Sequence, residues 1–205
     1  MGELATITTL FVDIGGVLLT NGWDHHSRRR AADEFGLDWD SMEARHQANV
    51  DAYEKGWLSL DDYLSRVIFN EPRPFTREAF WQFMCAQSVP EPGMLAYFTR
   101  LKQRYQLKIF AVSNEAKELN AYRIETFRLN QLFDAFLSSS FVHVRKPDIE
   151  IFRMALDISM TQPEQVFYVD NTAEFVTLAA GLGIRGQIHT DLATTSKALA
   201  QLGFA

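Results

Sequence analysis

The sequence predicts an α/β fold, in which helices flank a parallel sheet and a small all-helical segment is inserted after the first strand. Three observations support this class. Short apolar segments rich in β-branched residues alternate with segments of helical periodicity over residues 91–205. One more apolar segment of the same kind lies at residues 7–12. Between them, residues 20–90 show helical patterns only, so this stretch cannot be a simple crossover between two strands.

Five segments are predicted as strands because they are short and mostly apolar, as strands buried on both faces of a sheet are. They are residues 7–12, 107–112, 135–139, 166–169 and 187–189. The later strands are separated or followed by predicted helices at residues 93–105, 115–129, 148–159, 172–181 and 191–202. Gly93 and Gly181 suit helix ends, and Pro147 suits the first position of the helix that it opens.

The helical insertion is predicted to contain four helices, at residues 25–35, 41–53, 60–68 and 76–88. Gly36, Gly56 and the proline-containing segment 71–74 separate them. We therefore expect residues 20–90 to form a helical cap subdomain over the carboxyl end of the first strand. Residues 1–19 and 91–205 are expected to form the α/β core domain.

Composition limits the classes of partner. The chain has 205 residues, 47% of them hydrophobic, which suits one core with a small insertion. The net charge of -6 argues against nucleic acid or an anionic membrane as the main partner. No apolar run reaches the roughly 20 residues that cross a bilayer. The single cysteine, Cys85, cannot form an internal disulfide, so we expect a cytoplasmic location; the sequence does not define an oligomeric state.

Polar side chains stand at the carboxyl ends of the predicted strands, where ligands bind in an open parallel sheet. Asp13 ends the first strand, and Ser113 and Asn114 end the second. Lys146 follows the third strand, and Asp170 ends the fourth. Because parallel strands end at the same edge, we expect two carboxylates, a hydroxyl, an amide and an ammonium to meet there.

This set of side chains suits phosphoryl transfer to a carboxylate. Asp13 can attack phosphorus and form an acyl phosphate, which divides a difficult displacement into two easier steps. The adjacent glycines, Gly15 and Gly16, allow backbone N–H groups to approach the phosphate oxygens. Ser113 can donate to a phosphoryl oxygen, and Lys146 can balance the developing negative charge.

A hard divalent cation, most simply Mg²⁺, fits between Asp13, the carbonyl oxygen of Gly15 and Asp170. Without it, the two carboxylates and a phosphate dianion would repel one another. The sequence therefore predicts a magnesium site at this edge of the sheet.

In these motifs the chain resembles the haloacid dehalogenase (HAD) superfamily, in the branch with a helical cap after the first motif. The first motif is matched by FVDIGGVLL, the second by AVSNE, the third by RKPDIEIF and the fourth by VFYVDNTAEFVTLAAGLG. A turn of the cap is matched by YEKGWLSLDDYL. The resemblance implies a Rossmann-like core and a Mg²⁺-dependent phosphatase acting on a small phosphorylated metabolite.

The resemblance also implies roles for individual residues. It makes Asp13, Lys146 and Asp170 catalytic, and it places Lys146 among the phosphate ligands as well. The other phosphate ligands that it implies are Ile14, Gly15, Ser113 and Asn114. In the cap turn, it implies that Glu54 and Lys55 contact the substrate.

Two departures from the family pattern bear on activity. The family's phosphatase motif carries a second aspartate as general acid where this chain has Gly15, and its fourth motif often pairs two acids where this chain has Val169 and Asp170. Loss of a general acid costs about 10²–10⁴ in rate for a poor leaving group. A group of bacterial sugar-1-phosphatases has glycine at the same place. The resemblance therefore implies a substrate with a good leaving group, and a sugar 1-phosphate is the first candidate.

Two alternatives remain open from the sequence. A 2-haloacid dehalogenase would use Asp13 to attack carbon without Mg²⁺, although that motif has tyrosine at the position of Gly15. A catalytically impaired HAD-like binding protein is favoured by Gly15 and Val169, and opposed by the presence of the other motif residues together. Ser113, Asn114 and Asp170 each also suit the start of the following helix, which is a purely structural role.

Overall fold

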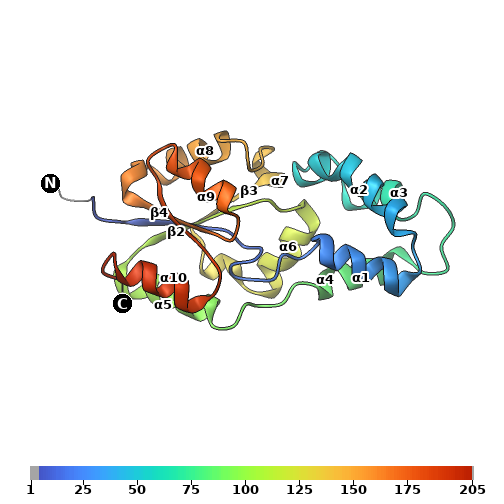
Figure 1. Ribbon diagram of the computed structural model, residues 1–205, viewed down its shortest axis with the longest axis horizontal. Helices are drawn as coiled ribbons and strands as arrows, with labels where there is room; N and C mark the ends of the chain where they lie inside the picture. The colour runs from blue at the N-terminus through green and yellow to red at the C-terminus, as the bar shows by residue number, and fades with distance from the viewer. Residues whose placement is uncertain (1–4, 205) are drawn as a thin grey trace.

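The computed structural model describes residues 5–204, which form a five-stranded parallel sheet between helices and a group of four helices beyond one end of it (Figure 1). The strands are β1 (Thr9–Val12), β2 (Lys108–Ser113), β3 (Ala135–Ser138), β4 (Val166–Asp170) and β5 (Arg185–Ile188). They lie in the order β3-β2-β1-β4-β5. This is a Rossmann-like α/β arrangement, and the predicted fold class is confirmed.

Helices cover both faces of the sheet (Figure 1). One face packs on α5 (Met94–Tyr105) and α10 (Leu192–Ala200), and the other on α8 (Glu150–Ser159) and α9 (Ala173–Ala180). Side chains alternate between the faces along β1: Leu10 and Val12 belong to the first apolar cluster, and Phe11 to the second. The remaining core elements are α6 (Lys117–Thr126), α7 (Ser139–Val142), η1 (Leu129–Gln131) and η2 (Pro163–Gln165).

The register of the sheet brings the ends of three strands to the same level. Val12 at the end of β1 pairs with Ala111 of β2 and with Val169 of β4. Asp13 directly follows β1, and Asp170 directly follows Val169 as the last residue of β4. The two acids therefore emerge from adjacent strands at one edge of the sheet.

The helical insertion consists of α1 (His25–Phe35), α2 (Trp39–Glu54), α3 (Leu60–Val67) and α4 (Arg77–Ala86). The buried side chains of these helices form an apolar cluster distinct from the two clusters of the sheet, and Ala116 is the core residue that joins it. A side-chain oxygen accepts a backbone N–H at the start of every helix, from Asp24, Asp38, Ser59 and Thr76. This independent packing supports our proposal that residues 20–90 are a separate subdomain.

Two linkers join the insertion to the core, and they run side by side. The backbone N–H of Thr20 donates to the carbonyl oxygen of Val89 (2.8 Å), and that of Val89 donates to Thr20 Oγ1 (3.0 Å). Arg123 of α6, fully buried beneath them, donates to the carbonyl oxygen of Thr20 and to Ser88 Oγ (3.1 Å). The same guanidinium pairs with the buried Glu115.

Several boundaries differ from prediction by one to three residues, and three of these differences lie near the carboxyl edge of the sheet. Helix α6 begins at Lys117, so Glu115 lies in the preceding loop, where its carboxylate pairs with a buried arginine. Helix α8 begins at Glu150, so Pro147 precedes the helix and does not occupy its first position. The segment after β3 forms the short helix α7 and does not extend the strand. Separately, no helix of residues 5–204 has the length and apolar character needed to cross a membrane.

Candidate active site

The three residues expected to be catalytic lie in one cluster at the carboxyl edge of the sheet. Lys146 Nζ is 2.6 Å from Asp170 Oδ2 and 3.3 Å from Asp13 Oδ2. All three side chains are buried, and Asp13 keeps the largest exposure, at 7%. Asp13 is therefore the carboxylate most open to a reactant.

Local hydrogen bonds fix both carboxylates. The backbone N–H of Ile14 donates to Asp13 Oδ1 (2.8 Å). Tyr168 Oη–H donates to Asp170 Oδ2, and the backbone N–H of Thr172 donates to Asp170 Oδ1 (2.7 Å). Thr172 is the residue preceding α9, so Asp170 also supports the turn into that helix, as the structural interpretation of this residue suggested.

Asn114 fixes the position of Lys146. Its side-chain Nδ2 donates to the carbonyl oxygen of Lys146 (2.9 Å), and its Oδ1 accepts the backbone N–H of Lys146 (2.8 Å). Neither Asn114 nor Ser113 caps the following helix, because the residue at that cap is Ala116. Ser113 is buried, its hydroxyl donates to Glu115 Oε1 (3.5 Å), and it also acts to lower the pKa of the Asp13 carboxyl.

The cluster is short of positive charge. Burial raises the pKa of Asp13 to about 7; Asp170 adds to the rise and Lys146 opposes it. Burial also disfavours the charge of Lys146, but the two carboxylates outweigh burial and raise the pKa of the ammonium. A charged lysine is thus shared between two acids, and one positive group does not compensate both.

Oxygen atoms suited to a hard cation meet at the same place. Asp170 Oδ1 accepts one hydrogen bond and keeps a lone pair, and among the described residues nothing donates to the carbonyl oxygen of Gly15. Within residues 5–204 no group of three or more His, Cys, Asp or Glu side chains could hold a metal. Two carboxylates with one carbonyl oxygen suit Mg²⁺, which usually keeps several waters in place of protein ligands.

The turn after Asp13 requires glycine at its centre. Gly16 has φ +72°, and a Cβ there would lie 2.1 Å from Asn171 Nδ2. The N–H of Gly16 donates to the carbonyl oxygen of Leu19 (2.7 Å), so it is not free for phosphate, contrary to the expectation that both glycines offer their N–H groups. Among the described residues, nothing accepts the N–H of Gly15.

Asn21 occupies the space next to Gly15. A Cβ built on Gly15 would lie 3.5 Å from Asn21 Cα and 3.6 Å from Asn21 Oδ1. The amide Nδ2 of Asn171 also donates to Asn21 Oδ1 (3.4 Å). An amide therefore stands beside the position where the family pattern has its second aspartate.

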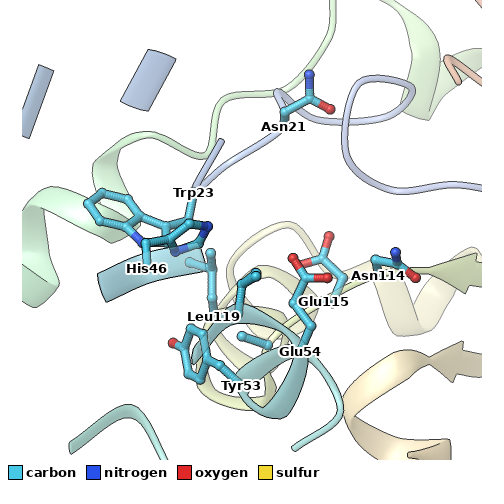
Figure 2. Close-up of a pocket in the computed structure, with 10 residues that line it drawn as sticks. Asn21, Trp23, His46, Tyr53, Glu54, Asn114, Glu115 and Leu119 are labelled. Carbon is cyan, nitrogen blue, oxygen red and sulfur yellow. The ribbon is translucent and has the colours of Figure 1, made fainter. Parts of the chain in front are cut away.

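A polar cavity of about 50 Å³ lies between the insertion and the core (Figure 2). The core contributes Asn114, Glu115, Ala116 and Leu119; the linker and α2 contribute Asn21, Trp23, His46, Val50, Tyr53 and Glu54. Figure 2 shows the carboxyl groups of Glu54 and Glu115 close to each other, one from α2 and one from the core. Glu54, one of the two predicted cap residues, thus lies at the cavity beside the candidate active site.

The turn that ends α2 is docked on the core next to Lys146. Ser139 Oγ donates to the carbonyl oxygen of Glu54 (2.6 Å), and His143 Nδ1 lies 2.7 Å from the carbonyl oxygen of Lys55. The side chain of Lys55 pairs with Asp51 of α2 (2.9 Å) and does not line the cavity. The structure therefore brings Glu54 to the site and leaves the ammonium of Lys55 outside it.

Sequence reasoning missed several residues at this site. Glu115 directly follows Asn114 in the second motif, and this adjacency was the only signal for it. Trp23 and His46 gave none, because they come from the linker and from α2 and meet only through the fold.

Comparison with known proteins identifies the class. The signature of the family described as haloacid dehalogenase-like hydrolase matches residues 61–185, more than half of the chain. The chain belongs to this family of haloacid dehalogenase-like hydrolases.

Solved structures share the fold at low sequence identity. A HAD family enzyme from Bacteroides thetaiotaomicron matches with a TM-score of 0.80 at 17% identity, covering 95% of this chain and 99% of that one. That enzyme has also been solved in complex with magnesium and inorganic phosphate. A predicted HAD-like hydrolase from Porphyromonas gingivalis matches at 0.76 and 19%, covering 98% and 100%. An L-2-haloacid dehalogenase matches at 0.67 and 15%, covering 95% and 99%.

Proposed function

We propose that the protein is a Mg²⁺-dependent phosphatase that acts on a small phosphorylated metabolite through an aspartyl phosphate on Asp13. One observation carries the proposal: Asp13, the most exposed of the buried acids, shares one ammonium with Asp170 and lies beside the hydroxyl of Ser113. A nucleophile, a charge-balancing cation and a donor to phosphate are thus assembled at one point.

The proposed reaction has two displacements at phosphorus. Asp13 attacks the phosphorus, the bond from phosphorus to the leaving-group oxygen breaks, and the leaving group takes a proton from water. A second water then attacks the aspartyl phosphate, which releases inorganic phosphate and restores the Asp13 carboxylate. Ser113 and the N–H of Gly15 hold phosphoryl oxygens, and Lys146 compensates the charge that develops on them. Asn114 keeps Lys146 in place through its backbone.

Asp13, Asp170 and the carbonyl oxygen of Gly15 are the residues that would hold Mg²⁺. The bound ion supplies positive charge that allows a phosphate dianion to approach two carboxylates. The donor set and the raised pKa of Asp13 support this assignment. So does the related enzyme from Bacteroides thetaiotaomicron, which binds magnesium together with inorganic phosphate.

The leaving group is proposed to be a good one. No carboxylate stands at Gly15, and the amide of Asn21 beside it can donate a hydrogen bond but cannot deliver a proton. Alkyl phosphates need such a proton more than anomeric phosphates do. A sugar 1-phosphate is therefore our first candidate substrate.

The first test removes the nucleophile. Asp13→Asn should abolish Mg²⁺-dependent release of phosphate from an aryl phosphate, because an amide does not attack phosphorus. Asp157→Asn, at an exposed position of α8, is the matched control and should keep the wild-type rate. Phosphate release is measured with excess Mg²⁺ and again after chelation of the metal. Undiminished release by Asp13→Asn would exclude the proposal.

The same assay separates the two alternatives. Release of chloride from a 2-haloacid without metal would indicate a dehalogenase, in which Asp13 attacks carbon. No turnover across a broad panel of phosphate esters by the folded protein would indicate a binding protein.

A further inference from the structure

A chain of hydrogen bonds inside the insertion ends at the cavity. Trp23 Nε1–H donates to Tyr63 Oη (2.8 Å), and His46 Nδ1 lies 2.8 Å from the same oxygen. Trp23 and His46 line the cavity (Figure 2). Tyr63 does not line it and is fully buried. Three residues from the linker, α2 and α3 therefore form one network.

The network determines which nitrogen of His46 carries the proton. An indole N–H can only donate, so Tyr63 Oη accepts from Trp23. Tyr63 has one hydroxyl proton, and among the described residues His46 Nδ1 is the atom placed to accept it. A buried hydroxyl without an acceptor is costly, so the tyrosine donates to Nδ1. The ring proton of neutral His46 is then on Nε2.

His46 also stays uncharged. Burial lowers the pKa of His46 to about 3; Arg28 and Arg145 lower it further, and Glu43 opposes them. Nε2 has no hydrogen-bond partner among the described residues. Since His46 lines the cavity and its Nδ1 is engaged by Tyr63, Nε2 is the ring nitrogen left for a group bound there.

The rest of the cavity disfavours negative charge. Its lining contains no lysine or arginine, and its two carboxyl groups are already paired, Glu54 with Arg145 (3.0 Å) and Glu115 with Arg123. Burial raises the pKa of both carboxyl groups, which means that the site disfavours their negative charge and would disfavour a further one. Their remaining lone pairs can accept hydrogen bonds from hydroxyl groups. The indole of Trp23 adds a flat apolar wall.

We propose that His46 is a specificity-determining residue that presents a fixed, neutral Nε2–H donor to an uncharged, hydroxyl-bearing leaving group, with Glu54 and Glu115 as acceptors. The inference rests on the proposed phosphatase function, since it assigns the cavity to the leaving group. Trp23 and Tyr63 are positioning residues that act through His46. A cavity of about 50 Å³ holds only a few waters, so a sugar must enter while the insertion is displaced from the core.

The kinetic test compares leaving groups that differ in one substituent. The probes are glucose 1-phosphate, glucuronic acid 1-phosphate and glucosamine 1-phosphate, with an aryl phosphate as reference. The neutral sugar should have the highest kcat/KM of the three. His46→Gln should lower its kcat/KM relative to the aryl phosphate by about five- to tenfold, the effect of one hydrogen bond, mainly through KM. His26→Gln, exposed on α1, is the matched control.

The second test does not depend on activity. Long-range ¹H–¹⁵N NMR of the labelled protein should show His46 with an unprotonated Nδ1 and a protonated Nε2. This pattern should stay the same from about pH 5 to about pH 8, because the pKa of His46 is lowered to about 3. Tyr63→Phe keeps the ring but removes the hydroxyl, and should let a share of His46 move its proton to Nδ1. This variant also covers the case in which His46→Gln does not fold.

The outcomes separate the two proposals. A protonated Nδ1 in the wild type, or equal kcat/KM for the neutral and acidic sugars, overturns the inference. So does a preference for the amino sugar, which would indicate a cationic leaving group. If none of the sugars reacts but Asp13-dependent hydrolysis of the aryl phosphate persists, the inference fails and the phosphatase stands. If no phosphate ester reacts, the phosphatase proposal fails, whatever the tautomer.

Discussion

At the scale of single residues, Gly15 and Asn21 act as a pair. The glycine lacks the acid of the family pattern, and Asn21 lies in van der Waals contact with the position that a Cβ at residue 15 would take. An acid restored at position 15 would therefore have to share its surroundings with a side chain that lies six residues further along the sequence.

Restoring the acid should require both positions. Gly15→Asp alone should leave hydrolysis of alkyl phosphates near the wild-type rate, because Asn21 obstructs the new carboxylate. Gly15→Asp combined with Asn21→Ser should raise kcat for an alkyl phosphate at least about tenfold, toward the lower end of what general acids contribute. Aryl phosphates should change little. Asn21→Ser alone is the control, and a single Gly15→Asp variant as active as the double variant would contradict this account.

The sequence predicted this residue-scale chemistry unevenly. Asp13, Ser113 and Asp170 follow apolar strands, so parallel topology alone predicts that they meet. Glu115, His46 and Arg123 were missed, since a charged or polar residue in a helical pattern is usually exposed. Their burial depends on partners from other elements, such as Tyr63 for His46, and spacing along the chain does not reveal such partners.

At the scale of elements, the turn between α2 and α3 is shaped to fit the core. Gly56 has φ +71°, and a Cβ there would lie 2.5 Å from the carbonyl oxygen of Ser140. That oxygen belongs to the backbone of α7 and cannot move aside alone. The turn and α7 can therefore touch only because position 56 has no side chain.

Gly56→Ala should separate this turn from α7. Gly36→Ala is a close control, because Gly36 has φ +63° in the same insertion but nothing within 4 Å of its added Cβ. Both variants should lose about 1–2 kcal/mol from the left-handed backbone. Only Gly56→Ala should also lower kcat/KM, by about tenfold or more, since it displaces Glu54.

Urea unfolding gives the stability of both variants, and steady-state kinetics gives their activity. Equal losses of kcat/KM in the two variants would mean that the contact with Ser140 does not matter for turnover.

Periodicity predicted where most elements lie but not where they end. The four helices of the insertion were expected because their segments show helical patterns and are separated by Gly36, Gly56 and the proline-containing segment 71–74. Helix α7 was missed because three serines after an apolar strand are equally compatible with an extended strand end. Helix α6 starts later than expected because the buried pair of Glu115 and Arg123 holds the loop before it. Tertiary contacts fix boundaries that local patterns leave open.

At the scale of the whole molecule, His46 should make stability depend on pH. Its folded pKa of about 3 lies below the ordinary value of 6.5. Between these values the unfolded chain binds a proton at this residue and the folded chain does not, so the free energy of unfolding falls as pH falls. The slope from one such group is at most about 1.4 kcal/mol per pH unit.

Urea titrations of wild type and His46→Gln at several pH values between 6.5 and 4 measure this contribution. The variant should lose stability less steeply on acidification, because it lacks the imidazole whose pKa is lowered in the folded chain. His26→Gln, at an exposed site, should follow the wild type. Parallel curves for wild type and His46→Gln would show that His46 titrates alike in the folded and unfolded chains.

The buried guanidinium of Arg123 has a mechanical consequence. Arg123 donates to Thr20 in the first linker and to Ser88 in the second, so both linkers are held to the core by one side chain. If one linker loosened alone, a buried N–H group of this guanidinium would lose its hydrogen-bond acceptor. The two linkers should therefore act as a single hinge, about which the four helices of the insertion move as a rigid unit. Glu115, whose carboxylate pairs with Arg123, also lines the cavity. Movement of the hinge should therefore shift a carboxylate at the place where the leaving group is expected.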